Sequence, residues 1–563
     1  MNTGPFRLQT EVLGALPLIA HFLSRLGIDA RLARWVPEGD ASVRLAPARA
    51  LGAALRCLCL RHEPLYALSE WAAPYDAALL GLASEERELL NDDRVARALT
   101  QLFDADRASL LTELVVAMIA TFNLDCSQLH NDSTTLSFHG DYPEATGQPR
   151  GGKPTPAIAH GHNKDHRPDL KQLLWILTVT ADGTVPLAYR TEPGNTSDDP
   201  THIPTWNRLV ELLGRADFLY VADSKLCSRP ALDHISSRGG RFLTVLPRTR
   251  REDGDFRSWV ATHAPDWQEV SRQPGRRRDD PPHLWWAFPW PQPSADGFRI
   301  CWFRSAQKLA QDADRRAERL RRAQADLAAL AKRLAGPRSR FRTRPAVEQA
   351  VQIILDRTET ARLITCTIRE QVEERFRQEQ RGRPGPQTRY RRVTRPRLHL
   401  SFSVDATAVR TEAASDGCFP LITNDHQMTP AQLLVAYKYQ PNLEQRHAEL
   451  KGPMDVAPIF LKDAARIEGL LCLEFLALLV RALIEREIRQ AMQRRHLEEL
   501  SLYPEDRGCR APTATRVLAI FSGLSRHRLF EGDRLAQVFP PDLTPLQRQV
   551  LDLLGIPEGD YTD

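Results

Sequence analysis

The sequence predicts a mixed α/β protein in which an all-helical domain precedes an α/β core and a long insertion interrupts that core. Three observations support this prediction. Residues 1–122 carry apolar residues at three- and four-residue spacing, which is typical of amphipathic helices. Residues 123–250 change to strand-like runs that alternate with helical ones. Residues 251–425 then bring aromatic strands, a heptad-like helix and a basic segment, before helical periodicity resumes.

Length and composition narrow the class of protein. A chain of 563 residues has room for about two to four domains. The net charge is only +5, from 76 basic and 71 acidic residues, so a nucleic-acid surface must come from local patches. The nine cysteines lack zinc-ligand spacing, the start lacks a signal-peptide pattern, and no apolar run reaches about 18 residues. We therefore expect a cytoplasmic protein with reduced thiols and no membrane partner.

Two helical regions stand out. In residues 1–122, Asn91 precedes DDRVARAL and is predicted to cap a helix. This all-helical domain suits DNA binding, but it also suits a packing domain that only supports the core, and no helix-turn-helix signature decides between them. The richest apolar run, 467–487, is interrupted by Glu474 and Arg481 and is predicted to be a core helix.

Two aspartates occupy unusual places in the α/β core. The predicted order in residues 123–250 is three strands, a helix, a strand, a helix and a strand. Asp132 lies in the first strand, within QLHNDSTTLSFHG, and Asp223 follows the fourth, within ADFLYVADSKL. Because aspartate is a poor strand former, an acid in each place needs a reason. Binding of a divalent metal provides one.

The insertion is predicted to form one arm. Its helical seam places apolar residues in three- and four-residue steps, at Leu320, Ala323, Leu327, Leu330 and Leu334. We expect the second helical stretch, 346–380, to pair back on this seam as a helical hairpin. The segment 381–397 is predicted to be a basic loop that contacts DNA phosphates through Arg389, Arg391, Arg392 and Arg395. The alternative is a solvated, charged coiled coil without a DNA role.

A third acid lies far downstream, in the stretch YKYQPNLEQRHAELKG. This stretch is predicted to be helical, and seven-residue spacing places Tyr437, Glu444 and Lys451 on one face. Pro441 is expected to kink the helix or to start a new one. Hard carboxylate oxygens are the ligands that Mg²⁺ prefers, and phosphodiester cleavage is well served by two such ions.

Other motifs give weaker predictions. His160, His162 and His166 resemble a metal-binding run, but no fourth ligand has suitable spacing, so we expect a structural or DNA-facing loop instead of a zinc site. The phosphate-binding pattern G-x4-G-K-[ST] does not occur. We therefore expect no nucleotide cofactor.

Several of these blocks resemble one family. Tyr437, Gln440, Glu444 and Lys451 have the spacing of the Y-x2-R-x3-E-x6-K signature of DDE transposases of bacterial insertion sequences, in the IS-four-type superfamily. HGHNKDHRPDLKQ (160–172), VADSKL and APIFLKDAARIEGLLCLEFLALL (457–479) resemble further family blocks, the first of them typical of the branch with a long insertion before the catalytic glutamate. The resemblance covers roughly residues 10–490. Gln440 departs from it, because the family has arginine there.

The resemblance implies a fold and a set of domains. The catalytic core would be ribonuclease H-like, with its first and fourth strands adjacent, and would be formed by residues 123–250 and 426–500. The insertion, 251–425, would separate them. The helices of 1–122 would bind element ends, and 501–563 would be a C-terminal helical tail of unreadable role.

The resemblance also implies an activity. The protein would be a DNA transposase that cuts insertion-sequence ends by metal-dependent hydrolysis and joins the 3′-hydroxyl to target DNA. Asp132, Asp223 and Glu444 would be catalytic and would hold two Mg²⁺ or Mn²⁺ ions. DNA contacts would come from Tyr437, Gln440 and Lys451.

The same resemblance implies binding partners and leaves two alternative functions open. The partners would be double-stranded DNA of the ends and target and a second copy of the chain when assembled on DNA, in a bacterial, nucleoid-associated setting. The alternatives are a ribonuclease H-like nuclease without strand transfer, or an inactive transposase-derived DNA-binding protein.

Overall fold

The computed structural model describes residues 6–38, 44–61, 63–275, 280–336, 339, 341, 343–456, 459 and 461–562. The chain divides into two compact units. The first unit comprises Met1–Thr244 and Val435–Asp563, and the second comprises Val245–Leu434. Three residues of the block 457–479 (457, 458 and 460) lie outside the described residues.

The first unit begins with a short strand and a group of helices. These elements are β1 (Phe6–Val12), α1 (Leu16–Leu26), α2 (Ile28–Trp35), α3 (Pro47–Leu60), α4 (Leu68–Ala72), α5 (Ser84–Arg87), α6 (Asp92–Asp104) and α7 (Arg107–Phe122). The predicted cap is confirmed: the Asn91 side chain accepts a hydrogen bond from the Arg94 amide at the start of α6. The all-helical prediction is wrong at β1, which is a strand.

A long helix forms the centre of this unit. α16 (Ala464–Arg494) packs against α1, α3, α6 and β4, and nearly all its side chains are buried. Glu474 and Arg481 both lie in the interior, so the prediction of a core helix is confirmed. No helix among the described residues is long and apolar enough to cross a membrane.

The sheet of the first unit has the predicted element order. Its elements are β2 (Gln128–Phe138), β3 (Lys171–Thr180), β4 (Pro186–Pro193), α8 (His202–Leu213), β5 (Leu219–Val221), α9 (Arg229–Ser237) and β6 (Arg241–Val245). The strands lie in the order β4-β3-β2-β5-β6. β2, β3 and β4 are antiparallel neighbours, whereas β5 runs parallel to β2, and β6 runs parallel to β5. The core is therefore a mixed sheet.

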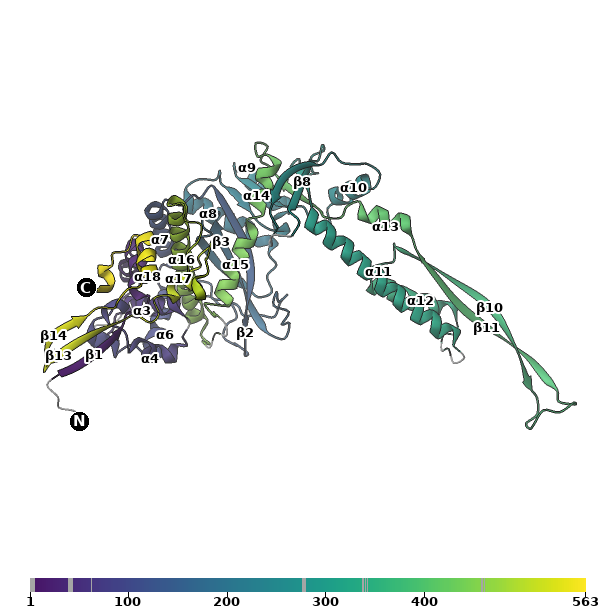
Figure 1. Cartoon of the computed structure of the whole chain (residues 1–563), viewed down its shortest axis with the longest axis horizontal. Helices are drawn as coiled ribbons and strands as arrows, with labels where there is room; N and C mark the ends of the chain where they lie inside the picture. Colours follow the sequence, from purple (N-terminus) through teal and green to yellow (C-terminus); the bar gives the residue numbers. More distant parts are fainter. Residues whose placement is uncertain are drawn as a thin grey trace. The chain divides into compact units, whose positions relative to one another are not determined.

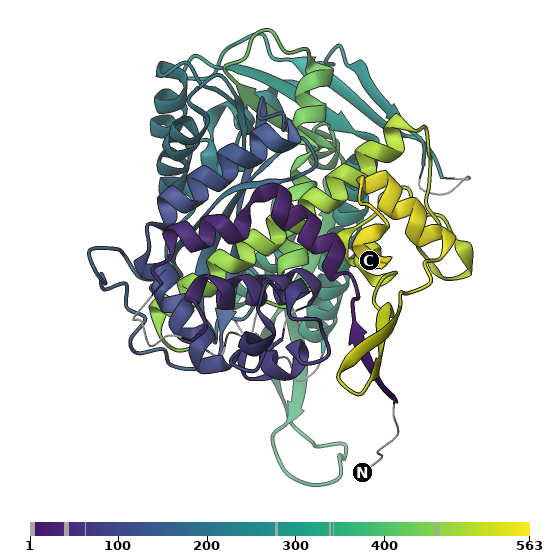
Figure 2. The ribbon, with the colours of Figure 1, turned by 90° about the vertical axis from the view of Figure 1, so that its left-hand side faces the viewer.

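The C-terminal region is only partly the helical tail that the sequence predicts. It contains α17 (Ala514–Ala519), α18 (Pro545–Leu554) and α19 (Gly559–Thr562), but also the hairpin of β13 (Ser525–Glu531) and β14 (Arg534–Phe539). β13 pairs with β1, so the two ends of the chain share one three-stranded sheet. Figure 2 shows purple β1 beside the yellow hairpin. These strands were missed because β1 acquires its partner only from the far end of the chain.

The second unit contains the insertion. Its helices are α10 (Arg251–Val260), α11 (Ala306–Ala335), α12 (Arg344–Arg357), α13 (Ala406–Ala413) and most of α14 (Pro430–Tyr437). Its strands are β7 (Gln268–Gln273), β8 (His283–Pro289), β9 (Arg299–Ser305), β10 (Ile364–Gln378), β11 (Tyr390–Val404) and β12 (Cys418–Thr423). β12, β9, β8 and β7 are antiparallel neighbours in that order. The seam of α11 is buried against α12, β10 and β11.

The predicted helical hairpin is confirmed only as far as Arg357, where α12 packs back on the seam of α11, and is wrong for the rest of the stretch 346–380. α12 ends at Arg357, and β10 pairs along its whole length with β11, so the arm ends in a two-stranded ribbon (Figure 1). Ile368, Val372 and Phe376 are four residues apart, a spacing that suits one face of a helix and also one face of a strand. The basic segment is likewise a strand from Tyr390 onward and not a loop.

Candidate active site

Asp132 and Asp223 lie at matching positions on neighbouring strands. β2 and β5 are parallel, with His130 opposite Val221 as the last paired position. Two residues beyond this pair, an aspartate follows in each case, Asp132 after His130 and Asp223 after Val221. Asp132 continues within β2, and Asp223 begins the turn after β5, where its side chain accepts a hydrogen bond from the Lys225 amide. The parallel register therefore brings together two acids that are 91 positions apart in the sequence.

The Asp132 carboxyl has a strongly perturbed acidity. Its pKa is raised to about 6: burial and the negative charges of Asp223 and Asp198 raise it, whereas Lys164 and the Ser133 amide act in the opposite direction. Burial also raises the pKa of Asp223, and Asp198 again contributes. Perturbed carboxyls of this kind are typical of functional sites.

Glu444 lies on a helix of its own. α14 ends at Tyr437, and α15 (Gln440–Lys451) begins three residues later with Pro441 in its first turn. The prediction of one continuous helix with Tyr437 and Glu444 on the same face is therefore wrong, and the alternative that Pro441 starts a new helix is confirmed. Proline suits this position because the first amides of a helix have no partner within it. Glu444 lies on the exposed side of α15.

Buried charges fix α15 in place. Arg446 donates to the carbonyls of Gly183 and Thr184 in the β3–β4 turn, at 3.2 and 3.0 Å. It also pairs with Glu485 of α16 at 2.8 Å. Glu449, on the next turn of α15, pairs with Arg481 of α16 at 2.7 Å. Moving α15 would separate these buried pairs and leave charges unbalanced in the interior, which costs free energy. These contacts therefore set the position of α15, and so of Glu444.

Burial and the charges of all three predicted catalytic acids raise the pKa of Tyr437. Burial raises the pKa of its phenol to about 12, and the charges of Asp223, Glu444 and Asp132 add to the effect. The charges of all three carboxylates therefore act on one side chain, although the sequence spreads them over more than 300 positions.

Gln440 has a different place from the one expected. It is buried, its Oε1 is 2.8 Å from Nδ1 of His130, and its Nε2 donates to the Asn131 carbonyl at 3.0 Å. These bonds join the start of α15 to β2, next to Asp132. The geometry favours a structural role for Gln440 over the DNA contact that the sequence predicts.

Lys451 is held by a partner. Its ammonium donates to both carboxylate oxygens of Asp165 at 2.9 Å, and its side chain is 26% exposed. Asp165 belongs to the block 160–172, which therefore lies against the end of α15. Lys451 is within reach of solvent, as a phosphate-binding lysine must be.

Three further residues at this site were missed by sequence reasoning. Lys164 donates to the carbonyl and hydroxyl of Ser133, at 2.6 and 2.9 Å. Asp198 accepts a hydrogen bond from the same hydroxyl at 2.7 Å. His447 lies with Nε2 at 3.9 Å from Oδ2 of Asp132. Two of these had a sequence signal: Lys164 belongs to the block 160–172, and His447 belongs to the stretch YKYQPNLEQRHAELKG.

The four arginines that the sequence predicts to contact DNA lie on the β10–β11 ribbon or in its connecting loop, and all four are exposed. Arg391 is opposite Arg377, and Arg395 is opposite Glu373. Because opposite residues of an antiparallel pair share a face, Arg391 and Arg395 form one basic face with Arg377. Arg389 precedes β11 in the connecting loop.

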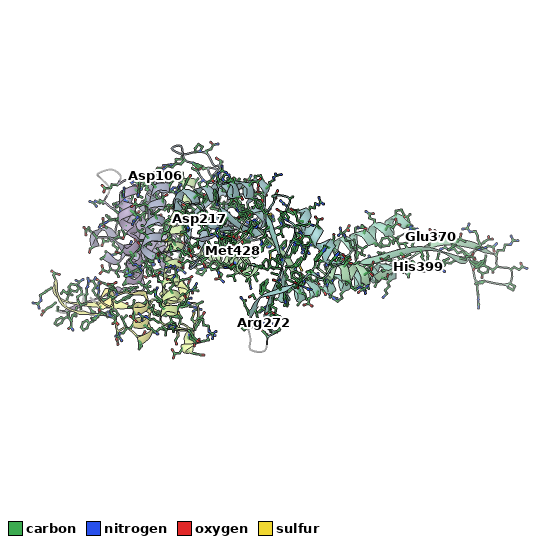
Figure 3. The ribbon with its side chains drawn as sticks, turned by 90° about the horizontal axis from the view of Figure 1, so that it is seen from above. Asp106, Asp217, Arg272, Glu370, His399 and Met428 are labelled. Carbon is green, nitrogen blue, oxygen red and sulfur yellow. The ribbon has the colours of Figure 1, made fainter. Side chains whose placement is uncertain are left out.

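The other face of the ribbon is partly apolar. Arg392 lies there opposite Phe376 and pairs with Glu374, and Tyr390, Val372 and Phe376 are exposed. Figure 3 labels Glu370 on β10 and His399 on β11, both at the surface. The two faces of the ribbon thus differ in character.

The acids suit a hard divalent cation. All three predicted ligands are carboxylates, and two of them have pKa values that are raised mainly by burial and also by neighbouring carboxylates, an unfavourable burial of negative charge that a cation relieves. Within the described part of the chain, no group of three or more His, Cys, Asp or Glu side chains is close enough together to hold a metal ion. The metal site remains a prediction based on the chemistry of the side chains.

Comparisons with known proteins say little about function. A family model described as a domain of unknown function (DUF4277) matches residues 8–116. No curated protein matches the chain. Among solved structures, the chain is similar to a piggyBac transposase synaptic complex with hairpin DNA, studied by cryo-electron microscopy. That similarity has a TM-score of 0.37 and 8% identity over 96% of this chain and 85% of the other, a level that carries no weight.

Proposed function

We propose that this protein is a DDE-type DNA transposase, which cuts insertion-sequence ends by metal-dependent phosphodiester hydrolysis and joins the freed 3′-hydroxyl to target DNA. One observation carries the proposal: Asp132 and Asp223 lie at matching positions of neighbouring parallel strands, and Glu444 lies on a helix packed against β2. The strand order β4-β3-β2-β5-β6 supports a ribonuclease H-like core, because the first and fourth strands of that core are adjacent.

Each side chain has a role in this proposal. Asp132, Asp223 and Glu444 would hold two Mg²⁺ or Mn²⁺ ions, and such ions would supply activation of the attacking oxygen and charge stabilisation of the leaving oxygen. Tyr437 keeps its proton, since its pKa is about 12, and is able to donate a hydrogen bond to the DNA backbone. Lys451 exchanges Asp165 for a phosphate oxygen.

DNA contacts extend beyond the site. In the second unit, no ion pair holds Arg377, Arg391 or Arg395 within the described residues, so these guanidiniums are available to phosphates. A two-stranded ribbon also has the width to enter a DNA major groove. We further propose that the helices of 1–122 bind element ends and that the working form is a homodimer on DNA.

Alanine variants test the catalytic residues. Asp132→Ala, Asp223→Ala and Glu444→Ala should each lower cleavage of end-containing DNA by about a thousandfold, because a lost ligand removes transition-state charge stabilisation. Binding of the same DNA should change little. Asp169→Ala is the matched control, because Asp169 pairs with the exposed Arg167 of its own loop. Glu444→Ala protein that still cuts with Mg²⁺ would refute the assignment.

A joining assay separates the transposase from a simple nuclease. Pre-cleaved ends with free 3′-hydroxyls, incubated with a plasmid and Mg²⁺, should become covalently joined to it. Cleavage without joining would favour a ribonuclease H-like nuclease. DNA binding without cleavage by the wild-type protein would favour an inactive DNA-binding protein.

A further inference from the structure

Lys164 makes an unusual set of contacts beside the acids. Its Nζ donates to the carbonyl and hydroxyl of Ser133, the residue after Asp132. The same Nζ is 3.6 Å from Oδ2 of Asp198, and the Ser133 hydroxyl donates to the other oxygen of that carboxylate. The side chains of Lys164, Ser133 and Asp198 thus contact one another beside β2. The Lys164 side chain is 37% exposed, so its ammonium has access to solvent.

The positive charge of Lys164 affects both aspartates of the site. It lowers the pKa of Asp132 and of Asp223, and so favours the ionised form of both carboxyls. Asp198 acts in the opposite direction on the same two groups. The charges of Lys164 and Asp198 therefore act on both aspartates with opposite sign, and Lys164 lies at 3.6 Å from Asp198 itself.

His447 gives independent evidence that water or a hydrated cation binds beside these acids. The residue is 6% exposed, and neither ring nitrogen meets normal hydrogen-bond geometry with a partner within the described part of the chain. The ring lies against Asp132, with Nε2 at 3.9 Å from Oδ2. Buried polar groups of native proteins are normally satisfied. An unsatisfied imidazole beside a carboxylate therefore indicates that water or a hydrated cation belongs between or beside them.

We propose that Lys164 is a stand-in cation for the carboxylate site: in the free protein its ammonium balances Asp132, Asp198 and Asp223, and a bound divalent cation displaces it. The inference rests on the proposed function, because it requires that a divalent cation bind at these acids. Lysine suits this role because it is a compact charge on a flexible stem, which is able to move away without rearranging the backbone. Asp198, which the sequence did not single out, becomes part of the cation site.

Mn²⁺ affinity of the free, full-length protein tests this inference without DNA or catalysis. Lys164→Met removes a competing positive charge and should tighten Mn²⁺ binding about tenfold, as measured by calorimetry. Asp198→Asn removes a negative charge and should weaken it roughly threefold to tenfold. Lys164→Arg keeps the charge and should bind Mn²⁺ much as the wild type does. A purely structural role would weaken binding in both neutralised variants.

Arg167→Met and Asp169→Asn are the matched controls, because this exposed pair belongs to the same loop and should leave Mn²⁺ affinity unchanged. Weaker or unchanged affinity in Lys164→Met would overturn the inference alone. If that variant does not fold, unchanged or tighter binding by Asp198→Asn, which keeps the side-chain volume, would overturn it too. A wild-type protein with no saturable Mn²⁺ binding would overturn both this inference and the metal site of the proposed function.

Discussion

Neutralising Asp132 should stabilise the free protein. Burial and neighbouring carboxylates raise the pKa of this group from 3.8 to about 6. Since the pKa is higher in the folded protein than in the unfolded chain, folding favours the protonated carboxyl, and the free energy of unfolding falls as the pH rises from about 4 through 6. A difference of about two pKa units corresponds to about 3 kcal/mol at neutral pH. The side chain is only 22% exposed, so solvent screens this effect weakly.

The assay is urea unfolding of Asp132→Asn and wild type in buffer free of divalent cations. At pH 7.5 the variant should be about 1–3 kcal/mol more stable, since asparagine avoids the buried charge but loses part of the bond from the Ser133 amide. Most of this gain should disappear by pH 4, where the wild-type carboxyl is protonated. Added Mn²⁺ should stabilise the wild type and not the variant.

Asp169→Asn provides a control of opposite sign. Its hydrogen bonds from Arg167 lower the pKa of Asp169 to about 2, so neutralising it should not stabilise the protein at pH 7.5. An Asp132→Asn protein that is no more stable than wild type at pH 7.5 would refute the reasoning, because burial would then not penalise the charged carboxyl.

Three further predictions concern positioning and DNA contact. Gln440→Ala should lower the free energy of unfolding by about 1–3 kcal/mol, measured in urea, because it leaves buried polar groups of β2 without partners. Arg446→Met should lower it by about 3–5 kcal/mol, because two buried glutamates each lose one of their arginine partners; a neutral effect would show that the ion pairs of Arg446 do not hold α15. Alanine at both Arg391 and Arg395 should reduce the slope of log K against log salt for duplex DNA by about 2, whereas alanine at Arg392, already paired with a glutamate, should change it less.

The sequence by itself determined the features that depend on local pattern. Alternation of strand-like and helical periodicity determined the order of elements around Asp132 and Asp223. Asn91 marked a helix start because a cap is a contact between near neighbours. Pro441 marked a possible new helix, because a missing amide has its effect within one turn.

Only the tertiary structure decided the features that depend on distant partners. The four-residue spacing of Ile368, Val372 and Phe376 fits a helix and a strand equally, and pairing with β11 resolves it. β1 is a strand because β13, more than 500 positions away, pairs with it.

The residues that surround the acids also could not be predicted from the sequence. Gln440 is interior because it meets His130, 310 positions away, and no local pattern reports such a contact. Lys164 and Asp198 meet at Ser133 through two separate loops. Local periodicity selects the elements, because it depends on backbone geometry within a few residues. Long-range pairing determines which side chains share the site, because burial and charge act through space and not along the chain.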